Sequence, residues 1–332
     1  MTHAASSVPT VPTVPTVPAV VTVGMHVADV LGRYVEGIPA GQGIALLDEI
    51  RLTVAGTAAA TAVDLAKLGV DVGTVGVVGA DALGTFLRDS MRASGVDVSR
   101  LRVDPHTPTS ATMLPIRRDG SRPALHVVGT NARLTEQDVP DEALRGARVV
   151  HLGGTCLLPG IDGAPSARLL ERARAFGAMT TMDFIPTGSD SDREAVMACL
   201  PHVDYLFPSE EDALSFAGAA TRAEAIEFYR RAGVGTVVIT MGGDGVSVSD
   251  ADGTDRRLAA YDVSVVDTTG CGDAFSAGFI LAVTEGASAD EAAEWGLCCG
   301  SLVATGLGSD AGITDRAALE EFRTSTPRRP SL

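Results

Sequence analysis

Residues 264–279 read Ser-Val-Val-Asp-Thr-Thr-Gly-Cys-Gly-Asp-Ala-Phe-Ser-Ala-Gly-Phe, and this stretch decides both the fold and the chemistry expected of the chain. A short β-branched run ends at Asp267, and Gly270-Cys271-Gly272 then forms a tight turn. From Asp273 onward, apolar residues recur at helical spacing. Glycines at a helix start leave backbone amides pointing forward, where the helix dipole favours an anion. A carboxylate beside such an anion hole suits proton removal while negative charge develops nearby, so the stretch predicts phosphoryl transfer to an alcohol.

The composition limits the class of protein further. With 332 residues, 45% of them hydrophobic, and 37 glycines, the chain suits one large α/β domain with an insertion, or two domains. A formal net charge of −16 argues against nucleic acid or an anionic membrane as the main partner. A phosphate ligand is compatible with that charge, because backbone amides can bind an anion without basic side chains.

Lysine is nearly absent, since Lys67 is the one lysine among 26 lysine and arginine residues. A P-loop needs a lysine after its glycines and a protein kinase needs a strand lysine, so neither nucleotide-binding pattern fits. The five cysteines form no Cys-x-x-Cys pair, which favours reduced thiols. The sequence has neither the apolar run of about 18 residues that a membrane span needs nor a signal-peptide pattern. We therefore expect a cytoplasmic protein with no membrane contact.

The two ends of the chain differ from its centre. Residues 8–18 repeat Val-Pro-Thr, and proline at every third position favours an extended, polyproline-like segment. We expect residues 1–18 to form a disordered tail, with a proline-rich ligand for a partner as the alternative. The folded domain is expected over residues 19–323, and residues 324–332 are expected to form a flexible C-terminal tail.

Between these tails, strand-like and helix-like segments alternate. This order predicts a doubly wound α/β fold, with a mainly parallel sheet covered by helices on both faces. The predicted strands, which are short and apolar, are 19–24, 72–78, 147–152, 179–184, 205–207 and 236–240. The predicted helices, which are amphipathic, are 82–94, 166–176, 210–216, 222–232, 290–305 and 315–323.

Two stretches interrupt this alternation. Residues 31–55 and 109–128 are turn-rich and alternate apolar with polar positions, without helical periodicity. Such segments suit a small antiparallel sheet inserted into the main domain. A sheet of this kind can cover a binding site, so we expect a small β-sheet lid.

With these features in place, residues 19–323 resemble the ribokinase-like (PfkB) family of carbohydrate kinases. The segment Asp267-Thr-Thr-Gly-Cys-Gly-Asp273 is similar to the family signature Asp-Thr-x-Gly-Ala-Gly-Asp, at a junction of strand, turn and helix. Cys271 stands in it where the family has a small residue. Weaker matches follow the family's order along the chain: Gly24-x-x-x-x-Asp29, Val78-Gly79-x-Asp81-x-x-Gly84, Gly129-x-Asn131-Ala132-x-Leu134 and Thr240-Met241-Gly242-Gly243-x-Gly245.

The resemblance implies a reaction and its catalytic residues. It implies transfer of the γ-phosphoryl group of ATP to a hydroxyl of a sugar or sugar-like substrate, by an enzyme that forms a homodimer through its lid. Asp273 would be the general base, and the amides of Gly270, Cys271 and Gly272 would form the anion hole. An aspartate that merely caps its helix is the alternative for Asp273.

The substrate site that the resemblance implies involves two segments. Asp29 resembles the residue that binds substrate hydroxyls, and a carboxylate can accept two hydrogen bonds from a vicinal diol. A plain capping role is the alternative for Asp29. The family's Gly-Gly-x-x-x-Asn-x-Ala pattern keeps Gly56 here, while its asparagine is replaced by Ala60. Since alanine has no hydrogen-bonding group, we expect a wider and more apolar pocket at this position.

The ATP site that the resemblance implies combines glycines with polar residues. Thr240, Gly242 and Gly245 resemble a loop that lets a nucleotide approach the backbone, with a plain β-turn as the alternative. The family's Asn-x-x-Glu motif corresponds to Ser209-Glu-Glu-Asp212. Ser209 would therefore contact the nucleotide with a hydroxyl where the family has an amide.

Two metal sites are implied as well. Asp212 and Glu211 would hold Mg²⁺ through water, since this ion usually retains several waters. An ordinary acidic first turn of a helix is the alternative for these two carboxylates. Asp267, Thr269 and Gly308 resemble contributors to a monovalent cation site. The expected cofactors are therefore ATP and Mg²⁺, with K⁺ as the candidate monovalent ion.

Other polar side chains receive a plainer interpretation. We interpret His26 and His151, near strand ends, as packed and hydrogen-bonded rather than as site residues. Three arginines of the second lid segment are interpreted as solvated hairpin charges, with contact to a substrate phosphate as the alternative: Arg117, Arg118 and Arg122.

Two other functions remain open on the sequence alone. A nucleoside kinase of the same fold is one, because Ala60 and the apolar 56–62 segment leave room for a base. A non-catalytic sugar or nucleotide sensor is the other, because the Ser209–Asp212 motif departs from the family pattern. A dehydrogenase is a more distant third.

Overall fold

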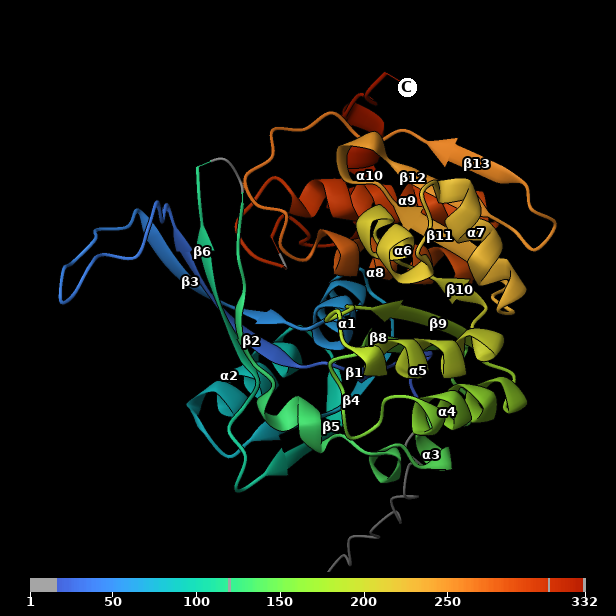
Figure 1. The fold of residues 1–332 in the computed structure, drawn as a ribbon, viewed down its shortest axis with the longest axis horizontal. Helices are drawn as coiled ribbons and strands as arrows, with labels where there is room; N and C mark the ends of the chain where they lie inside the picture. The colour runs from blue at the N-terminus through green and yellow to red at the C-terminus, as the bar shows by residue number, and fades with distance from the viewer. Residues whose placement is uncertain (1–16, 119–120, 310, 331–332) are drawn as a thin grey trace, which may run out of the picture.

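The computed structural model describes residues 17–118, 121–309 and 311–330. These residues form a nine-stranded sheet and a separate four-stranded sheet (Figure 1). The strand order of the large sheet is β13-β12-β11-β10-β9-β8-β1-β4-β5. Its strands are β1 (Val20–Gly24), β4 (Val72–Gly79), β5 (Asp97–Asp104), β8 (Val149–Thr155), β9 (Met179–Phe184), β10 (Tyr205–Leu206), β11 (Thr236–Thr240), β12 (Val246–Ser249) and β13 (Asp255–Leu258).

The large sheet is mainly parallel. Val20 of β1 lies in register with Val72 of β4 on one side and with Val149 of β8 on the other. At one edge, β12 pairs antiparallel with both of its neighbours, β11 and β13. The predicted doubly wound, mainly parallel fold is therefore confirmed, although the sequence analysis did not predict β5, β12 or β13.

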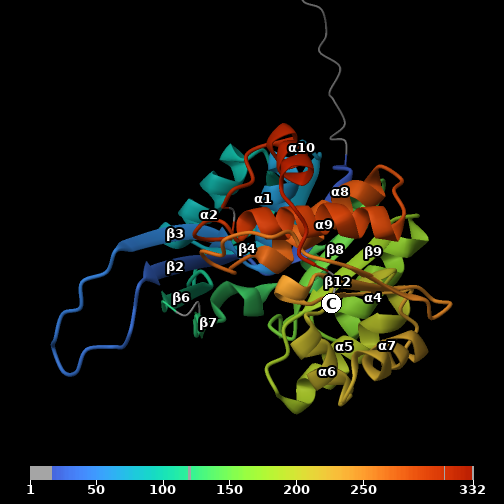
Figure 2. The ribbon, with the colours of Figure 1, turned by 90° about the horizontal axis from the view of Figure 1, so that it is seen from above.

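Side chains that alternate along the strands build a hydrophobic core on each face of the sheet. Val20 packs into one core and its neighbour Val21 into the other. Two layers of helices cover these cores, as Figure 2 shows. One layer holds α1 (Thr57–Lys67), α2 (Ala82–Ala93), α8 (Cys271–Thr284), α9 (Ala289–Val303) and α10 (Arg316–Ser325). The other holds α3 (Asp141–Leu144), α4 (Ala164–Ala175), α5 (Asp190–Cys199), α6 (Glu210–Ala217) and α7 (Arg222–Arg231).

The smaller sheet projects from the domain and has the order β3-β2-β6-β7. Its strands are β2 (Val27–Arg33), β3 (Glu49–Ala55), β6 (Ala111–Ile116) and β7 (Leu125–Val127). The expectation of an antiparallel sheet is wrong for one pair, because β2 and β6 run parallel. The reason is that β2 and β6 continue from β1 and β5, which already run in the same direction in the large sheet. Residues 34–48 lie between β2 and β3 as an exposed loop rather than as sheet.

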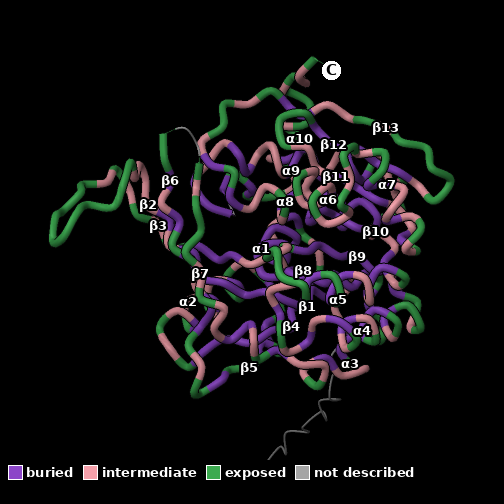
Figure 3. The backbone as a smooth tube through the Cα atoms, viewed as in Figure 1, coloured by how far each residue is buried: buried purple, intermediate pink, exposed green. Residues whose placement is uncertain are grey.

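The two faces of the small sheet differ in burial. Leu31, Leu114 and Ile116 are buried and pack with Leu307 in a small core of their own. The other side exposes large apolar groups, and Figure 3 shows how much of this sheet is exposed compared with the main domain. The exposed apolar residues of the small sheet are Ile50, Leu52, Met113, Leu125 and Val127.

The C-terminal segment packs against the domain up to the last described residue, unlike the flexible tail expected from residue 324. The helix α10 runs to Ser325, and the amide of Asp262 then donates a hydrogen bond of 2.8 Å to the carbonyl oxygen of Pro327. Arg328 places its guanidinium 3.8 Å from the ring centroid of Tyr261. We call residues 327–330 the C-terminal strap.

Residues 1–16, with most of the Val-Pro-Thr repeat, lie outside the described residues. Of the tail expected over residues 1–18, Val17 and Pro18 are described, and Val17 packs against the core that also holds Val21. No helix of the described chain is long and apolar enough to cross a membrane.

Candidate active site

The turn at the start of α8 requires glycine at its first position. Gly270 caps this helix in the left-handed region, at φ 77°. A Cβ atom at this position would overlap the backbone of Ser309. Because α8 begins at Cys271, the amides of its first turn have no partner within the helix and point out of its N-terminus. The turn therefore has the geometry of an anion-binding helix end.

The β-branched run before this turn is not a strand, which corrects the predicted junction of strand, turn and helix. Residues 264–266 lie outside every strand of the described chain. The amide of Val266 donates to the carbonyl oxygen of Ala304, 2.8 Å away, just after α9 ends. The run therefore lies beside the C-terminal end of α9 and is not part of a sheet.

The carboxylate of Asp267 connects the turn to the loop at Gly308 through hydrogen bonds. One of its carboxylate oxygens accepts hydrogen bonds from the amide of Thr269 at 3.0 Å and from its hydroxyl at 2.8 Å. The other oxygen accepts the amide of Gly308 at 3.0 Å. The three residues of the expected monovalent cation site thus lie together, but these donors already engage both oxygens of the buried carboxylate.

A cavity of about 770 Å³ lies between the small sheet and the turn, and we call it the lid cavity. It brings together residues far apart in the sequence. Asp29 of β2, Gly56 before α1 and Asp273 of α8 all line it. Part of its wall is apolar, formed by Met25, Val27, Leu114, Leu157, Phe184, Ile185 and Phe207.

Carboxylates crowd the lid cavity, and their pKa values reflect it. Burial, together with the nearby charges of Asp183 and Asp29 and against the charge of Arg122, raises the pKa of Asp273 to about 8. Burial also raises the pKa of Asp29 to about 6, against a hydrogen bond from Thr112 and the charge of Arg122. Asp273 is therefore a stronger proton acceptor than an exposed aspartate once it is deprotonated.

Arg122 reaches from the small sheet to the turn at the start of α8, which corrects its interpretation as a solvated charge. Its Nε atom donates to the hydroxyl of Thr268 at 3.1 Å, and an Nη atom donates to the carbonyl oxygen of the same residue at 3.2 Å. It also lies 3.9 Å from a carboxylate oxygen of Asp267. Arg118, on the same hairpin, does remain exposed.

Asp183, at the end of β9, is a lid-cavity residue that the sequence analysis missed. Its carboxylate accepts the amide of Gly154 at 2.6 Å and lies 3.4 Å from the ring of His151. The available signal was its position near the carboxyl end of a buried strand, since ligands bind where parallel strands end. His151 is buried and also hydrogen-bonds Thr181, and the buried His26 bonds the Gly24 carbonyl, so both are packed as predicted.

Gly56 and Ala60, which were both expected at the substrate site, lie in different environments in the structure. Gly56 lines the lid cavity with φ 89°, and a Cβ atom there would lie 2.6 Å from the carbonyl oxygen of Met25. Ala60 lines no part of this cavity and is 1% exposed, which corrects its expected place in the pocket. The reason is that α1 begins at Thr57 and turns Ala60 into the core. Thr57 lines the cavity instead, and its buried hydroxyl has no hydrogen-bond partner.

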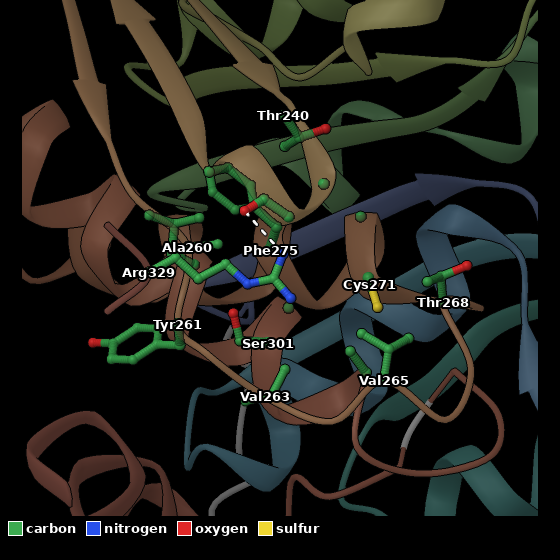
Figure 4. Close-up of a pocket in the computed structure, with 17 residues that line it drawn as sticks. Thr240, Ala260, Tyr261, Val263, Val265, Thr268, Cys271, Phe275, Ser301 and Arg329 are labelled. Carbon is green, nitrogen blue, oxygen red and sulfur yellow. Dashed lines mark hydrogen bonds between the residues drawn. The ribbon is translucent and has the colours of Figure 1, made fainter. Parts of the chain in front are cut away.

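A second cavity, of about 300 Å³, lies beside the loop that follows β11, and we call it the glycine-loop cavity (Figure 4). Thr240, Gly242 and Gly245 line it. Gly245 has φ 98°, and a Cβ atom there would overlap the carbonyl oxygen of Leu258. The remaining wall is mostly apolar or backbone, formed by Gly243, Ala260, Tyr261, Val263, Val265, Cys271, Phe275, Leu297, Gly300, Ser301 and Ala304.

The two cavities meet at the turn that begins α8. Thr240, Thr268 and Gly272 line both of them. Asp273 faces the lid cavity, whereas Cys271 faces the glycine-loop cavity. A group that passes from one cavity to the other therefore crosses the amides at the start of α8.

The acidic motif at the start of α6 is divided between cavity and solvent. Ser209 donates its hydroxyl to a carboxylate oxygen of Asp212 at 2.6 Å and accepts the Asp212 amide at 3.1 Å. Both residues line the lid cavity rather than the glycine-loop cavity. Glu211 is exposed and lines neither, but its charge adds to burial in raising the pKa of Asp212. Over the described residues, no three acidic, histidine or cysteine side chains gather in a metal-binding cluster.

The sequence of the chain is similar to those of known kinases. The model of the pfkB family of carbohydrate kinases matches residues 18–316. A ribokinase of Haemophilus influenzae is 26% identical over 279 residues, which cover 82% of this chain and 88% of the relative. A cytidine kinase of Thermococcus kodakarensis is 31% identical over 259 residues, which cover 75% of this chain and 87% of the relative.

The fold is also found among solved structures. The ribokinase of Arabidopsis thaliana, solved in complex with ribose and ATP, superposes with a TM-score of 0.80 at 23% identity. The match covers 93% of this chain and 99% of that one. At this identity the likeness concerns the fold alone.

Proposed function

The chain belongs to the pfkB family of carbohydrate kinases, and from this premise we propose that it transfers the γ-phosphoryl group of ATP to a hydroxyl of an uncharged sugar or sugar-like acceptor. The observation that carries the proposal is the junction of the two cavities. The glycine-loop cavity would hold the nucleotide and the lid cavity the acceptor. The transferring group would then lie at Gly272 and Thr268, which line both.

Proton transfer and charge stabilisation come from the two sides of this junction. Asp29 would accept hydrogen bonds from acceptor hydroxyls, and Asp273 would accept the proton of the reacting hydroxyl. The hydroxyl oxygen bonds to the γ-phosphorus, the bond to the bridging oxygen breaks, and ADP leaves. The amides of Gly270, Cys271 and Gly272 would stabilise the charge on the transferring group, which is the main requirement of phosphoryl transfer.

Mg²⁺ fits this site only as a hydrated ion. Asp212, at the start of α6, is one of the carboxylates on the cavity wall and would hold one of its waters, with Glu211 nearby and more exposed. This agrees with the preference of Mg²⁺ for one or two carboxylates, several waters and substrate phosphates. When bound, the ion would neutralise charge on the phosphates. Ser209 would contact the nucleotide only near its phosphates, because it lines the lid cavity.

The charge of the lid cavity favours a neutral acceptor. Four carboxylates line it, against one arginine, Arg122: these are Asp29, Asp183, Asp212 and Asp273. An acceptor that carries a phosphate or carboxylate would add a further negative charge to a cavity that already raises the pKa of Asp273. We therefore expect neutral sugars or nucleosides to be phosphorylated in preference to phosphosugars and sugar acids.

A nucleoside acceptor is the second candidate. The lid cavity has room for more than a single sugar ring, and Phe184, Ile185 and Phe207 give it an apolar wall against which a base could stack. The likeness to a cytidine kinase supports including nucleosides. A non-catalytic sensor would bind the same ligands without forming ADP.

Three further expectations belong to the same proposal. A K⁺ site at Asp267, Thr269 and Gly308 would use backbone carbonyl oxygens, because the Asp267 carboxylate already accepts three hydrogen bonds. A homodimer would cover the exposed apolar side of the small sheet, including Ile50 and Met113. The cysteines of the described chain are unpaired, which suits a cytoplasmic protein.

The test is a screen for ADP formation with Mg²⁺ and K⁺ present. Pentoses, hexoses, nucleosides, sugar acids and phosphosugars are offered in turn, with a reaction lacking acceptor as the background. We expect ADP above background with at least one neutral sugar or nucleoside. ADP formation with phosphosugars or sugar acids alone would contradict the neutral acceptor, and its absence with every compound would favour a sensor.

A further inference from the structure

Arg329 of the C-terminal strap lies at the wall of the glycine-loop cavity. Figure 4 shows its side chain extending from the side of Ala260 toward Cys271, with the guanidinium over the cavity. One Nη atom donates to the carbonyl oxygen of Gly243 at 3.4 Å, and the Nε atom lies 3.5 Å from a carboxylate oxygen of Asp262. These contacts are long, so the guanidinium can exchange them for contacts with a ligand.

The backbone of the strap fixes where this side chain starts. The amide of Arg329 donates to the carbonyl oxygen of Ala260 at 2.9 Å, and Arg328 donates to the carbonyl oxygen of Ala259 at 2.7 Å. Arg328 also forms an ion pair with Glu294 and covers the ring of Tyr261. The strap is therefore bound to the segment that forms the cavity wall, and these contacts do not involve the side chain of Arg329.

The order of the cavities assigns Arg329 to one end of a bound nucleotide. The glycine-loop cavity shares Thr268 and Gly272 with the lid cavity at its inner end. It shares Gly243 and Arg329 with a third cavity, of about 490 Å³, at its outer end. A triphosphate whose γ-phosphoryl group reaches the inner end must point its nucleoside toward the outer end.

We propose that Arg329 binds the base of the phosphoryl-donor nucleotide, which rests on the proposed function placing that nucleotide in the glycine-loop cavity. A planar guanidinium can stack on an aromatic ring and donate hydrogen bonds from its edge. The surrounding Val263, Val265 and Leu297 offer apolar contact but no charge. The strap lies beyond residue 316, where the family match ends.

The test compares two ligands that share phosphates but not a base. Calorimetric titration measures the affinity of the protein and its Arg329→Ala variant for ADP and, as a ligand that binds through phosphates alone, for tripolyphosphate. We expect the variant to bind ADP about tenfold more weakly, while its affinity for tripolyphosphate stays within about twofold. Arg231→Ala is the control, because this arginine is 79% exposed on α7 and lines none of the cavities described above.

A second variant displaces the Arg329 side chain by a substitution at the neighbouring Gly243. A Cβ atom at Gly243 would collide with the guanidinium and with no other nearby group, so Gly243→Ala should displace the Arg329 side chain. We expect Gly243→Ala to weaken ADP binding in the natural chain and to add little in the Arg329→Ala background.

Three outcomes would overturn the inference. They are unchanged ADP affinity in Arg329→Ala, equal weakening of ADP and tripolyphosphate, and fully additive effects of the two substitutions. The melting temperature of each ligand-free variant is measured alongside, since a contact that only held the strap would lower it without a selective loss of ADP binding. Calorimetry needs no acceptor, so ADP binding that depends on Arg329 in a chain that phosphorylates nothing would contradict the proposed function alone.

Discussion

The lid cavity and the glycine-loop cavity meet at one turn, yet they are built from different parts of the chain. Asp29, Asp183, Asp273 and Arg122 give the lid cavity charged side chains from four separate segments. The glycine-loop cavity is lined mainly by glycine backbone and apolar groups. The difference fits the proposed roles, in which one cavity would recognise hydroxyl groups through side chains and the other would accommodate a large ligand by leaving side chains out.

The difference also accounts for the shortage of lysine. A chain that binds phosphates through the amides at the start of α8 does not need the lysine of a P-loop. Lys67 lies at the end of α1 and lines neither of the two cavities that meet at the turn. The net charge of −16 is therefore compatible with a nucleotide site.

The largest effect is expected from Asp273→Asn, which removes the proposed proton acceptor from the lid cavity. We expect kcat to fall by about 100- to 10,000-fold, because a general base contributes on this scale. Calorimetry should find ADP affinity nearly unchanged, since the nucleotide cavity keeps its backbone. A large loss of ADP binding would show that the two cavities are not separate in function.

The same substitution should stabilise the fold. A pKa of about 8 in the folded chain, above the ordinary value, means that the charged carboxylate opposes folding. That cost is absent below about pH 4 and grows until the pH passes 8. At pH 8 we expect Asp273→Asn to raise the free energy of unfolding by about 2–4 kcal/mol, measured by urea denaturation.

The next effect contrasts two glycines of the turn. Gly270→Ala introduces a Cβ atom at φ 77° that overlaps Ser309, so we expect a loss of about 2–4 kcal/mol of stability. Gly272→Ala meets nothing within 4 Å and should fold normally, but its methyl group would enter the junction and weaken nucleotide binding. Equal melting temperatures for the two variants would contradict the described geometry.

A smaller effect is expected at the lid. Arg122→Gln loses a charge-assisted contact to Thr268, so we expect the KM of the acceptor to rise about tenfold. The KM of ATP should change less, because Arg122 does not line the glycine-loop cavity. Arg118→Gln is the matched control on the same hairpin, where the side chain is 68% exposed, and its steady-state constants should be unaltered.

The smallest effect is a shift in pH dependence. The charge of Asp183 helps to raise the pKa of Asp273, so Asp183→Asn should lower that pKa. Because Asp273 must be deprotonated to act, kcat/KM rises with pH up to about 8 in the natural chain. In the variant, this rise should occur about one pH unit lower. An unchanged profile would mean that Asp183 does not influence the catalytic carboxylate.

The sequence predicted the parts of the fold that depend on local pattern. Buried strands such as Val72–Gly79 and amphipathic helices such as Ala82–Ala93 follow from their apolar periodicity. The turn at Gly270 was recognisable because its glycines stand at the start of a helix. The pairing of β2 with β6 was not predictable from local pattern, since it depends on the direction of the strands that precede them.

The residues that sequence reasoning missed are those without local context. Asp183 is an isolated carboxylate in an apolar strand, and Arg122 is an arginine in a polar hairpin, so neither carries a motif. Ala60 was expected at the pocket from its place in a motif, but the rotation of α1 decides which residue faces the cavity. Arg329 reaches its cavity only because the C-terminal strap folds back over Tyr261.

The contact of Arg122 with Thr268 has a consequence for the timing of turnover. The hairpin that carries Arg122 would cover the acceptor, while Thr268 belongs to the turn that would hold the transferring group, 146 residues further along the chain. A small sheet that swings away to exchange its ligand must break both hydrogen bonds at once. Opening of the small sheet would then also release Thr268, so exchange of the acceptor and the geometry around the transferring group would be mechanically coupled.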